Sequence, residues 1–299
     1  MIHVGFLGLG QMGAPMAERL FGEGIQLHVF DPRPEATAPF IARGAIAHDS
    51  PRGVADAAGI VLACLPSGEV SKAAALGPQG VVHGTAIRIH AEMSTIGSAC
   101  VRRIEAGLAT RGIALVDAPI TGGPPGARAG TLAMMAAGSP AAVEELSPLL
   151  LRIGRAVYPV GEQPGQAQVM KLVNNVLVAT HIVTTLEAFA MGAKAGLDPD
   201  MMAALVNAGT GRSYVSTDVM GDVLSGRFAF GASVAVLDKD IALGVQTASD
   251  LGVPMWTIEQ AARVWRFAAS HGQAGQDMTA LAKLIEGWAG AEIRSRPKP

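Results

Sequence analysis

The stretch that decides the fold is Gly8-Leu9-Gly10-Gln11-Met12-Gly13, which follows the apolar run Ile2 to Leu7 and precedes the helical pattern Ala14 to Glu23. In this strand–turn–helix setting the first glycine permits a tight turn, and the second lets the backbone approach a pyrophosphate. The third glycine lets the helix pack against the strand, and the start of the helix offers N–H groups to phosphates. An ordinary glycine-rich turn is the competing interpretation, but the flanking strand and helix favour a nucleotide site.

The next strand, expected over 25–30, ends at Asp31. An acidic residue about 20 positions beyond the fingerprint accepts hydrogen bonds from the adenosine ribose of NAD, and its charge repels a 2′-phosphate. Arg33 follows two residues later and could instead grip the 2′-phosphate of NADP, or be a solvated charge after Pro32. We therefore expect NAD as the preferred cofactor, with NADP as the alternative.

Composition limits the classes of partner. The 299 residues suffice for about two domains. The formal net charge of −2 gives no footprint for a nucleic acid or an anionic membrane. Two cysteines, Cys64 and Cys100, make no disulfide scaffold and fit a reducing compartment, so a cytoplasmic location is expected. The chain starts almost at once with a strand, and no signal peptide is expected.

The first half of the chain alternates strand-like and helix-like segments, which predicts an α/β, Rossmann-type domain on a mostly parallel, doubly wound sheet. Strands are expected over 2–8, 25–30, 44–48, 59–65, 86–92, 113–118, 132–137 and 155–160. Helices are expected over 11–23, 33–43, 51–57, 68–76, 97–111 and 140–152. Residues 1–162 are thus expected to form a dinucleotide-binding domain.

Helical periodicity dominates after about Gly161, so residues 163–299 are expected to form an all-α domain for substrate binding and oligomerisation. A long interdomain helix is expected over 166–195. Its lysines, asparagines and glutamate would be costly in lipid, which argues against a membrane span. Gly196 is expected to end this helix in the left-handed conformation, and Pro199 to start the next one.

In open α/β sheets, ligands bind outside the carboxyl ends of the strands. Three segments follow strands there and are expected to line a cleft closed by the helical domain: Leu65-Pro66-Ser67, Met93-Ser94-Thr95 and Pro119-Ile120-Thr121-Gly122-Gly123. Gly122 and Gly123 carry no obstructing side chain, so their N–H groups can meet a small carboxylate, and Thr121 adds a hydroxyl donor. From the spacing alone, a long connection without any ligand is equally supported.

Lys171 and Asn175 stand four residues apart on the expected long helix and therefore share a face. The neighbours of Lys171 are apolar, and desolvation would lower its pKa toward the range useful for acid–base catalysis. Unaided by other observations, a lysine whose stem packs while its ammonium reaches water is the more common outcome. Lys239-Asp240 is expected to begin a further helix, either reaching the cleft or lying exposed. The histidines have no metal-ligand spacing, so no metal is expected.

Four segments, in this order along the chain, resemble the β-hydroxyacid dehydrogenases, also called the 3-hydroxyisobutyrate dehydrogenase family: Gly8 to Ala17, Asp117 to Leu132, Lys171 to Asn175, and Lys239-Asp240. Each motif alone is unspecific, but together they span nearly the whole chain. The resemblance implies a Rossmann-type N-terminal domain, a helical C-terminal domain, and assembly as a homodimer or homotetramer.

By this resemblance Lys171 is the catalytic lysine and Asn175 the substrate-orienting asparagine. Thr121, Gly122 and Gly123 match the loop for the substrate carboxylate, where the family usually has Ser-Gly-Gly. Thr95 and Lys239 match positions near the nicotinamide and its ribose. The whole cofactor-binding set expected is Gly8, Leu9, Gly10, Gln11, Met12, Gly13, Asp31, Arg33, Leu65, Pro66, Thr95 and Lys239.

The activity that the resemblance implies is oxidation of a small β-hydroxy acid, or reduction of the matching semialdehyde, by an NAD(P)-dependent enzyme with a lysine as general acid and base. Two alternatives stay open. Imine reductases share the architecture but usually have another proton donor in place of the lysine. The presence of Lys171 therefore argues against an imine reductase. A non-catalytic NAD(P)-binding sensor or scaffold tends to lose the lysine as well, and fold alone does not exclude it. The sequence does not name the hydroxy acid.

Overall fold

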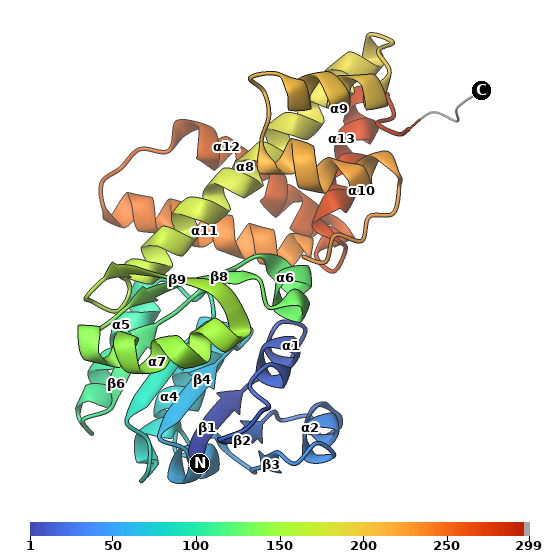
Figure 1. Ribbon diagram of the computed structural model, residues 1–299. Helices are drawn as coiled ribbons and strands as arrows, with labels where there is room; N and C mark the ends of the chain where they lie inside the picture. The colour runs from blue at the N-terminus through green and yellow to red at the C-terminus, as the bar shows by residue number, and fades with distance from the viewer. Residues whose placement is uncertain (296–299) are drawn as a thin grey trace. The chain divides into compact units, whose positions relative to one another are not determined.

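The computed structural model describes residues 1–295 (Figure 1). The chain divides into two compact units, and the break lies between Lys171 and Leu172. This position is inside the long helix α8 (Gln166–Lys194). The domain boundary expected after residue 162 falls before that helix begins, and it stays a prediction.

One nine-stranded sheet forms the centre of the first unit, in the order β3-β2-β1-β4-β5-β6-β8-β7, with β9 beside β8. The strands are β1 Ile2–Leu7, β2 Ile25–Phe30, β3 Ile46–Ala47, β4 Ile60–Ala63, β5 Ile89–Glu92, β6 Ala114–Asp117, β7 Ile120–Thr121, β8 Leu132–Ala137 and β9 Gly154–Gly161. Strands β1 to β6 pair in parallel, whereas β8 runs antiparallel to β6 and β7. The strand order reverses between β1 and β4, which is where such sheets bind ligands.

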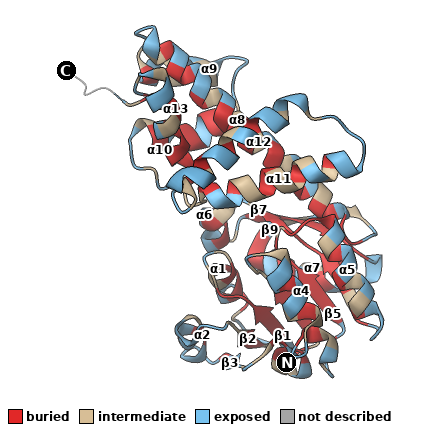
Figure 2. Cartoon of the chain, turned by 180° about the vertical axis from the view of Figure 1, so that it is seen from behind, coloured by how far each residue is buried: buried red, intermediate tan, exposed pale blue. Residues whose placement is uncertain are grey.

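Helices cover both faces of this sheet. One face packs against α1 (Gly13–Glu18), α2 (Pro34–Ile41) and α7 (Pro140–Ile153), and the other against α3 (Pro51–Ala57), α4 (Gly68–Leu76) and α5 (Ser98–Ala109). Successive residues of β4 alternate between the two cores: Ile60 and Leu62 join the first, Val61 and Ala63 the second. Figure 2 shows the strands largely in red, the colour of buried residues. Burial on both faces explains why these strands are continuous apolar runs.

The glycine-rich run after β6 contains two elements that the sequence did not predict. It forms the short strand β7 and then a helix, α6 (Gly123–Ala129). Pro124 and Pro125 stand in the first turn of α6, where a missing N–H costs nothing and the fixed φ suits a helix. Helix α1 is also shorter than the expected 11–23, and the chain reaches β2 through a connection in which Gly24 has a φ of +80°.

The second unit is helical, as expected. After α8 come α9 (Pro199–Ala208), α10 (Met220–Leu224), α11 (Val234–Asp250), α12 (Trp256–Ala268) and α13 (Leu281–Ala289). Gly196 ends α8 with a φ of +90°, and Pro199 opens α9, which confirms both expectations. The expectation that Lys239-Asp240 begins a helix is wrong. Helix α11 begins five residues earlier, because Ser233 caps it by accepting a hydrogen bond from the N–H of Val236.

Within residues 1–295, α8 is the one helix long and apolar enough to span a membrane by length and composition. The core helix of a folded domain satisfies the same criterion. Ile182, Leu186 and Phe189 of α8 are buried in the core of the second unit, where Trp265 donates its indole N–H to the carbonyl of Ala179 at 3.0 Å. These contacts give α8 the character of a core helix.

Candidate active site

The fingerprint turn joins β1 to α1, and its three glycines serve different ends. Gly8 has a φ of +88°, and a Cβ there would stand 2.4 Å from the carbonyl oxygen of Cys64. A Cβ on Gly13 would stand 1.9 Å from the carbonyl oxygen of Gly8. At Gly10 a Cβ would meet nothing within 4 Å. Two glycines are therefore required by packing, while the middle one leaves the main chain bare toward open space, which is the arrangement that a pyrophosphate needs.

Asp31, directly after β2, is tied to the same turn. Its Oδ2 accepts the N–H of Leu9 at 2.8 Å, and both carboxylate oxygens accept hydrogen bonds from Arg33, at 2.9 and 3.1 Å from the guanidinium. Burial works to raise the pKa of Asp31, but the bonds from Arg33 and Leu9 prevail and hold it below its usual value. Asp31, which favours NAD, and Arg33, which favours NADP, therefore form an ion pair with each other.

Two of the three strand-end segments are held together by a hydrogen bond. The N–H of Leu65 donates to Oγ of Ser94 at 2.7 Å, and the N–H of Ser94 donates to Oε1 of Glu92 at 2.9 Å. This arrangement places Leu65, after β4, beside the segment that contains Thr95, after β5. The carboxyl ends of adjacent parallel strands meet in this way at one edge of the sheet.

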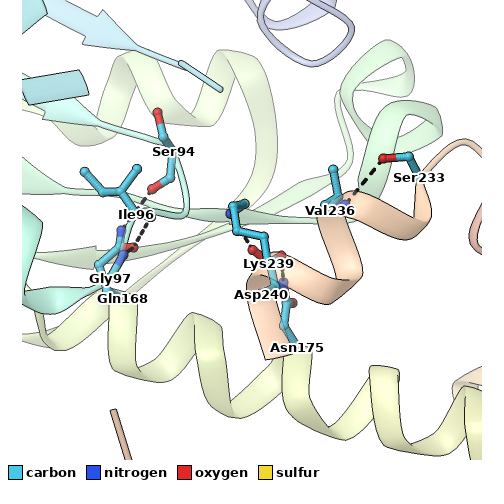
Figure 3. A network of polar contacts seen from close by, with 9 residues as sticks. All are labelled: Ser94, Ile96, Gly97, Gln168, Asn175, Ser233, Val236, Lys239 and Asp240. Atoms are coloured by element: carbon cyan, nitrogen blue, oxygen red, sulfur yellow. Dashed lines mark hydrogen bonds and ion pairs between the residues drawn. The ribbon is translucent and has the colours of Figure 1, made fainter. Parts of the chain in front are cut away.

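A glutamine on α8 binds this segment from the other side (Figure 3). Oε1 of Gln168 accepts the N–H groups of Ile96 and Gly97 at 2.9 and 3.0 Å. Its Nε2 donates to the carbonyl of Ser94 at 3.0 Å and to Oδ1 of Asp117 at 2.7 Å. The side chain of Gln168 is fully buried. The first turn of α8 is therefore fixed to the chain after β5 and to the end of β6.

Asp117, the last residue of β6, also caps the start of α8. Its Oδ2 accepts the N–H groups of Gly165 and Gln168 at 2.9 and 3.0 Å. A carboxylate at this pole of a helix satisfies donors that lack partners within the helix. Lys171 follows Gln168 by three residues, and 9% of its surface is exposed. The candidate lysine therefore emerges from a helix turn whose position is fixed on two sides.

The candidate carboxylate loop begins in β7 and ends in α6. Thr121 is the last residue of β7, and Gly122 and Gly123 follow with φ values of +125° and +62°. Both glycines are needed for their backbone conformation, because side-chain-bearing residues rarely adopt such angles. From the sequence, we expected them to matter because they carry no side chain. Gly122 is exposed, so its main chain is open to solvent.

In the second unit, Asp240 holds two of the predicted site residues (Figure 3). Its Oδ2 accepts a hydrogen bond from Nδ2 of Asn175 at 2.6 Å, and its Oδ1 forms an ion pair with Nζ of Lys239 at 2.6 Å. Asn175 and Asp240 are both buried, whereas the side chain of Lys239 is 36% exposed. The alternative of an exposed pair at a helix start therefore fails for Asp240.

A buried acid lies behind the segment that follows β5. Burial raises the pKa of Glu92 to about 7 and that of Asp117 to about 6, although the hydrogen bonds to both carboxylates act in the opposite direction. His90, on the same strand as Glu92, is buried as well, and its pKa is lowered to about 4. Glu92 and Asp117 are therefore sensitive to protonation near neutral pH, at the back of the candidate site, whereas His90 stays neutral there.

Two family models match the chain in succession. Residues 3–161 match the NAD-binding domain of 6-phosphogluconate dehydrogenase, and residues 165–285 match the NAD-binding domain of NADP-dependent 3-hydroxyisobutyrate dehydrogenase. A 3-hydroxyisobutyrate dehydrogenase from Pseudomonas aeruginosa is 31% identical, over 96% of this chain and 99% of its own. The chain belongs to the 3-hydroxyisobutyrate dehydrogenase family. The resemblance found in the sequence is thereby confirmed.

Other members of this family are comparably similar. A 2-(hydroxymethyl)glutarate dehydrogenase from Eubacterium barkeri is 33% identical over 98% of this chain and 97% of its own. The crystal structure of a 3-hydroxyisobutyrate dehydrogenase from Salmonella typhimurium superposes with a TM-score of 0.84 at 29% identity, covering 95% of this chain and all of the other. The fold is therefore that of the family, and the chain is an oxidoreductase of a nicotinamide-binding class.

Sequence reasoning missed the residues that hold the predicted ones. Gln168 and Asp117 are 51 residues apart, and Asn175 and Asp240 are 65 residues apart. Periodicity and spacing carry no signal for such pairs. The available hint was chemical: a glutamine between Ala167 and Val169, and an aspartate directly after a lysine, are polar residues that a buried position tolerates only when they are paired.

Proposed function

We propose that this protein catalyses the oxidation of a small β-hydroxy acid with NAD, and the reverse reduction of the semialdehyde, with Lys171 as general base and acid. One observation carries the proposal. Within the first unit, the helix turn that leads to Lys171 is bonded to the segment after β5 and to the last residue of β6, on the sheet whose first strand precedes the fingerprint turn. Such sheets bind ligands outside the carboxyl ends of their strands, which supports a role for the lysine that follows this helix turn.

The residues present fit a nicotinamide dinucleotide. The bare main chain at Gly10 would receive the pyrophosphate, Asp31 would meet the adenosine ribose, and Leu65, Pro66 and Thr95 would border the nicotinamide. When bound, the cofactor supplies the hydride chemistry, and the protein supplies position and electrostatics. We propose NAD rather than NADP because the carboxylate of Asp31 directly follows β2, while Arg33, which would favour NADP, is already paired with Asp31.

Proton transfer is the step of the reaction that the residues of this chain carry out. Lys171, as a neutral amine, would take the proton of the substrate hydroxyl during oxidation, and as an ammonium it would return the proton during reduction. Thr121 and the main chain at Gly122 and Gly123 would hold the carboxylate. Asn175, one turn beyond Lys171 on α8, would orient the same substrate, and its bond to Asp240 fixes its amide.

The test is a panel of small hydroxy acids with NAD and NADP, followed by absorbance of the reduced nicotinamide. The panel should include 3-hydroxyisobutyrate and glycerate, and cofactor binding should be measured separately by fluorescence quenching. We expect turnover of at least one β-hydroxy acid with NAD. Binding of the cofactor without turnover of any small acid would contradict the proposal and favour the sensor or scaffold.

A further inference from the structure

The carboxamide of Gln168 is saturated. A primary amide has two donor hydrogens and an oxygen with two lone pairs, and here all four positions are used. Three of the bonds go to the main chain of residues 94–97, and the fourth goes to Asp117. The segment so fixed contains Thr95, and Asp117 is followed within four residues by Thr121. One side chain thus connects the two strand ends to which the proposed function assigns the nicotinamide and the substrate.

We infer that Gln168 is a positioning residue, whose amide sets where Lys171 stands relative to the segments that contain Thr95 and Thr121. The inference rests on the proposed function, because it concerns the lysine to which that function assigns the proton. Gln168 touches neither substrate nor cofactor in this account. It acts through the first turn of α8, three residues before Lys171.

The chemistry of the surroundings requires a glutamine. Two N–H donors face Oε1, whereas two acceptors, the carbonyl of Ser94 and the carboxylate of Asp117, face Nε2. Glutamate would turn an oxygen toward both acceptors. Methionine has a similar length but would leave all four groups without their partner, in a site from which water is excluded. Neither substitute can hold the first turn of α8, residues 94–97 and the end of β6 in their present relative positions.

The effect on catalysis follows from distance. A displacement of about 1 Å between a catalytic group and its substrate costs on the order of 100-fold in rate. The segment 94–97 has further anchors, because Ser94 is bound by Glu92 and binds Leu65. Loss of Gln168 should therefore shift the start of α8 relative to these loops while the sheet stays folded.

The first measurement needs no substrate or cofactor. Hydrogen exchange of Gln168→Met and Gln168→Glu should be compared with wild type in the peptides that contain Ile96 and Gly97. Because Gln168→Met removes the acceptor of both N–H groups, we expect at least tenfold faster exchange there. Gln168→Glu retains an acceptor, so the exchange rate of these N–H groups should lie between those of wild type and Gln168→Met. The matched control is Gln166→Met in the same helix turn, because Gln166 is exposed and its carboxamide accepts only the N–H of Gln163 among the bonds found.

The second measurement is a double-mutant cycle on kcat. Gln168→Glu alone should lower kcat by about 10- to 100-fold and leave the KM for NAD within twofold of wild type. In a Lys171→Ala background the same change should cost less than threefold, because a residue that acts through the lysine has nothing left to position. Gln166→Met should leave kcat unchanged in both backgrounds.

The outcomes separate this inference from the proposed function. Equal losses with and without Lys171, or unchanged exchange at Ile96 and Gly97 in both Gln168 variants, would overturn the positioning role even if the enzyme turns over hydroxy acids. A Lys171→Ala variant with wild-type kcat would refute the proposed function and the positioning role together, whatever the exchange data show. Non-additive losses together with faster exchange would support the inference.

Discussion

Two carboxamide–carboxylate pairs, one in each unit, hold residues of α8 in different ways. Gln168 donates to Asp117 at 2.7 Å in the first unit, and Asn175 donates to Asp240 at 2.6 Å in the second. The other oxygen of Asp117 accepts two main-chain N–H groups, whereas the other oxygen of Asp240 binds the ammonium of Lys239. The first pair therefore fixes the course of the main chain. The second fixes the direction of two side chains.

This difference predicts different consequences of damage. A buried pair that bonds the main chain should matter for stability as well as for rate, because its loss leaves several buried donors without acceptors. A pair that directs side chains should matter for rate with less effect on unfolding. Lys171 stands between the two pairs along α8, so both reach it through one helix.

The largest expected effect is on that lysine itself. Lys171→Ala should lower kcat by roughly 10²–10⁴-fold, the usual worth of positioned proton transfer, with NAD affinity nearly unchanged. Lys194→Ala is the matched control at the far end of α8, where the lysine donates to the carbonyl of Gly290, and it should change kcat less than twofold. Steady-state kinetics and fluorescence titration measure the two quantities. Near-normal turnover in Lys171→Ala would remove this residue from its assigned role.

Part of the fold and of the candidate site could be predicted from the sequence. The fingerprint turn, the alternating strands and the long α8 follow from local patterns, because glycine positions and apolar periods depend on neighbouring residues. Helix α6 was missed because two prolines after two glycines are typical of a loop as well as of a first helix turn. The partners of Gln168 and Asn175 were missed because nothing local ties residues so distant in the chain. The raised pKa of Glu92 depends on burial, which only the folded chain decides.

The next largest effect is expected on the free energy of unfolding. It depends on Glu92, which binds the N–H of Ser94 in the segment that Gln168 also holds. Its pKa is about 7 when folded and near its ordinary 4.5 when unfolded, so the folded state keeps a proton that the unfolded state loses. The free energy of unfolding should therefore fall as pH rises from 4.5 to 7, by roughly 3 kcal/mol, because one pKa unit corresponds to about 1.4 kcal/mol.

His90 acts oppositely below its ordinary pKa, since its proton is held more tightly in the unfolded state. The contribution of Glu92 must therefore be isolated as a difference between wild type and Glu92→Gln, by urea unfolding at pH 5 and pH 8. The variant keeps an acceptor for the N–H of Ser94. We expect the free energy of unfolding of Glu92→Gln, relative to that of wild type, to be higher at pH 8 than at pH 5. The same difference at both pH values would show that Glu92 does not titrate in this range.

A variant of the second pair, Asn175 and Asp240, should show the contrast with the first. Asp240→Ala leaves the amide of Asn175 and the ammonium of Lys239 without their carboxylate. Because Asn175 and Lys239 would then lose the contact that directs their side chains, kcat/KM for the hydroxy acid should fall about 10- to 100-fold, as for a misplacement of about 1 Å. Asp238→Ala is the control, since Asp238 lies on the same helix and pairs with the exposed Arg266. Equal losses in both variants would contradict the contrast between the two pairs.

The smallest expected effect concerns a third, partly exposed pair. Arg33→Ala frees the carboxylate of Asp31 from its guanidinium. The ratio of kcat/KM for NAD to that for NADP should rise by about two- to fivefold, because exposed ion pairs contribute little. Initial rates with both cofactors measure it. A fall in this ratio would mean that Arg33 serves the binding of NAD rather than that of NADP.

In the proposed reaction, the amine of Lys171 meets the hydroxyl of a small acid. A crystal structure of the protein with NAD and a turned-over hydroxy acid tests it most directly. We expect Nζ of Lys171 at about 2.6–3.2 Å from the oxygen of that hydroxyl, which is the reach of a general base. A Lys171 side chain directed into solvent, with another residue on the hydroxyl, would contradict it.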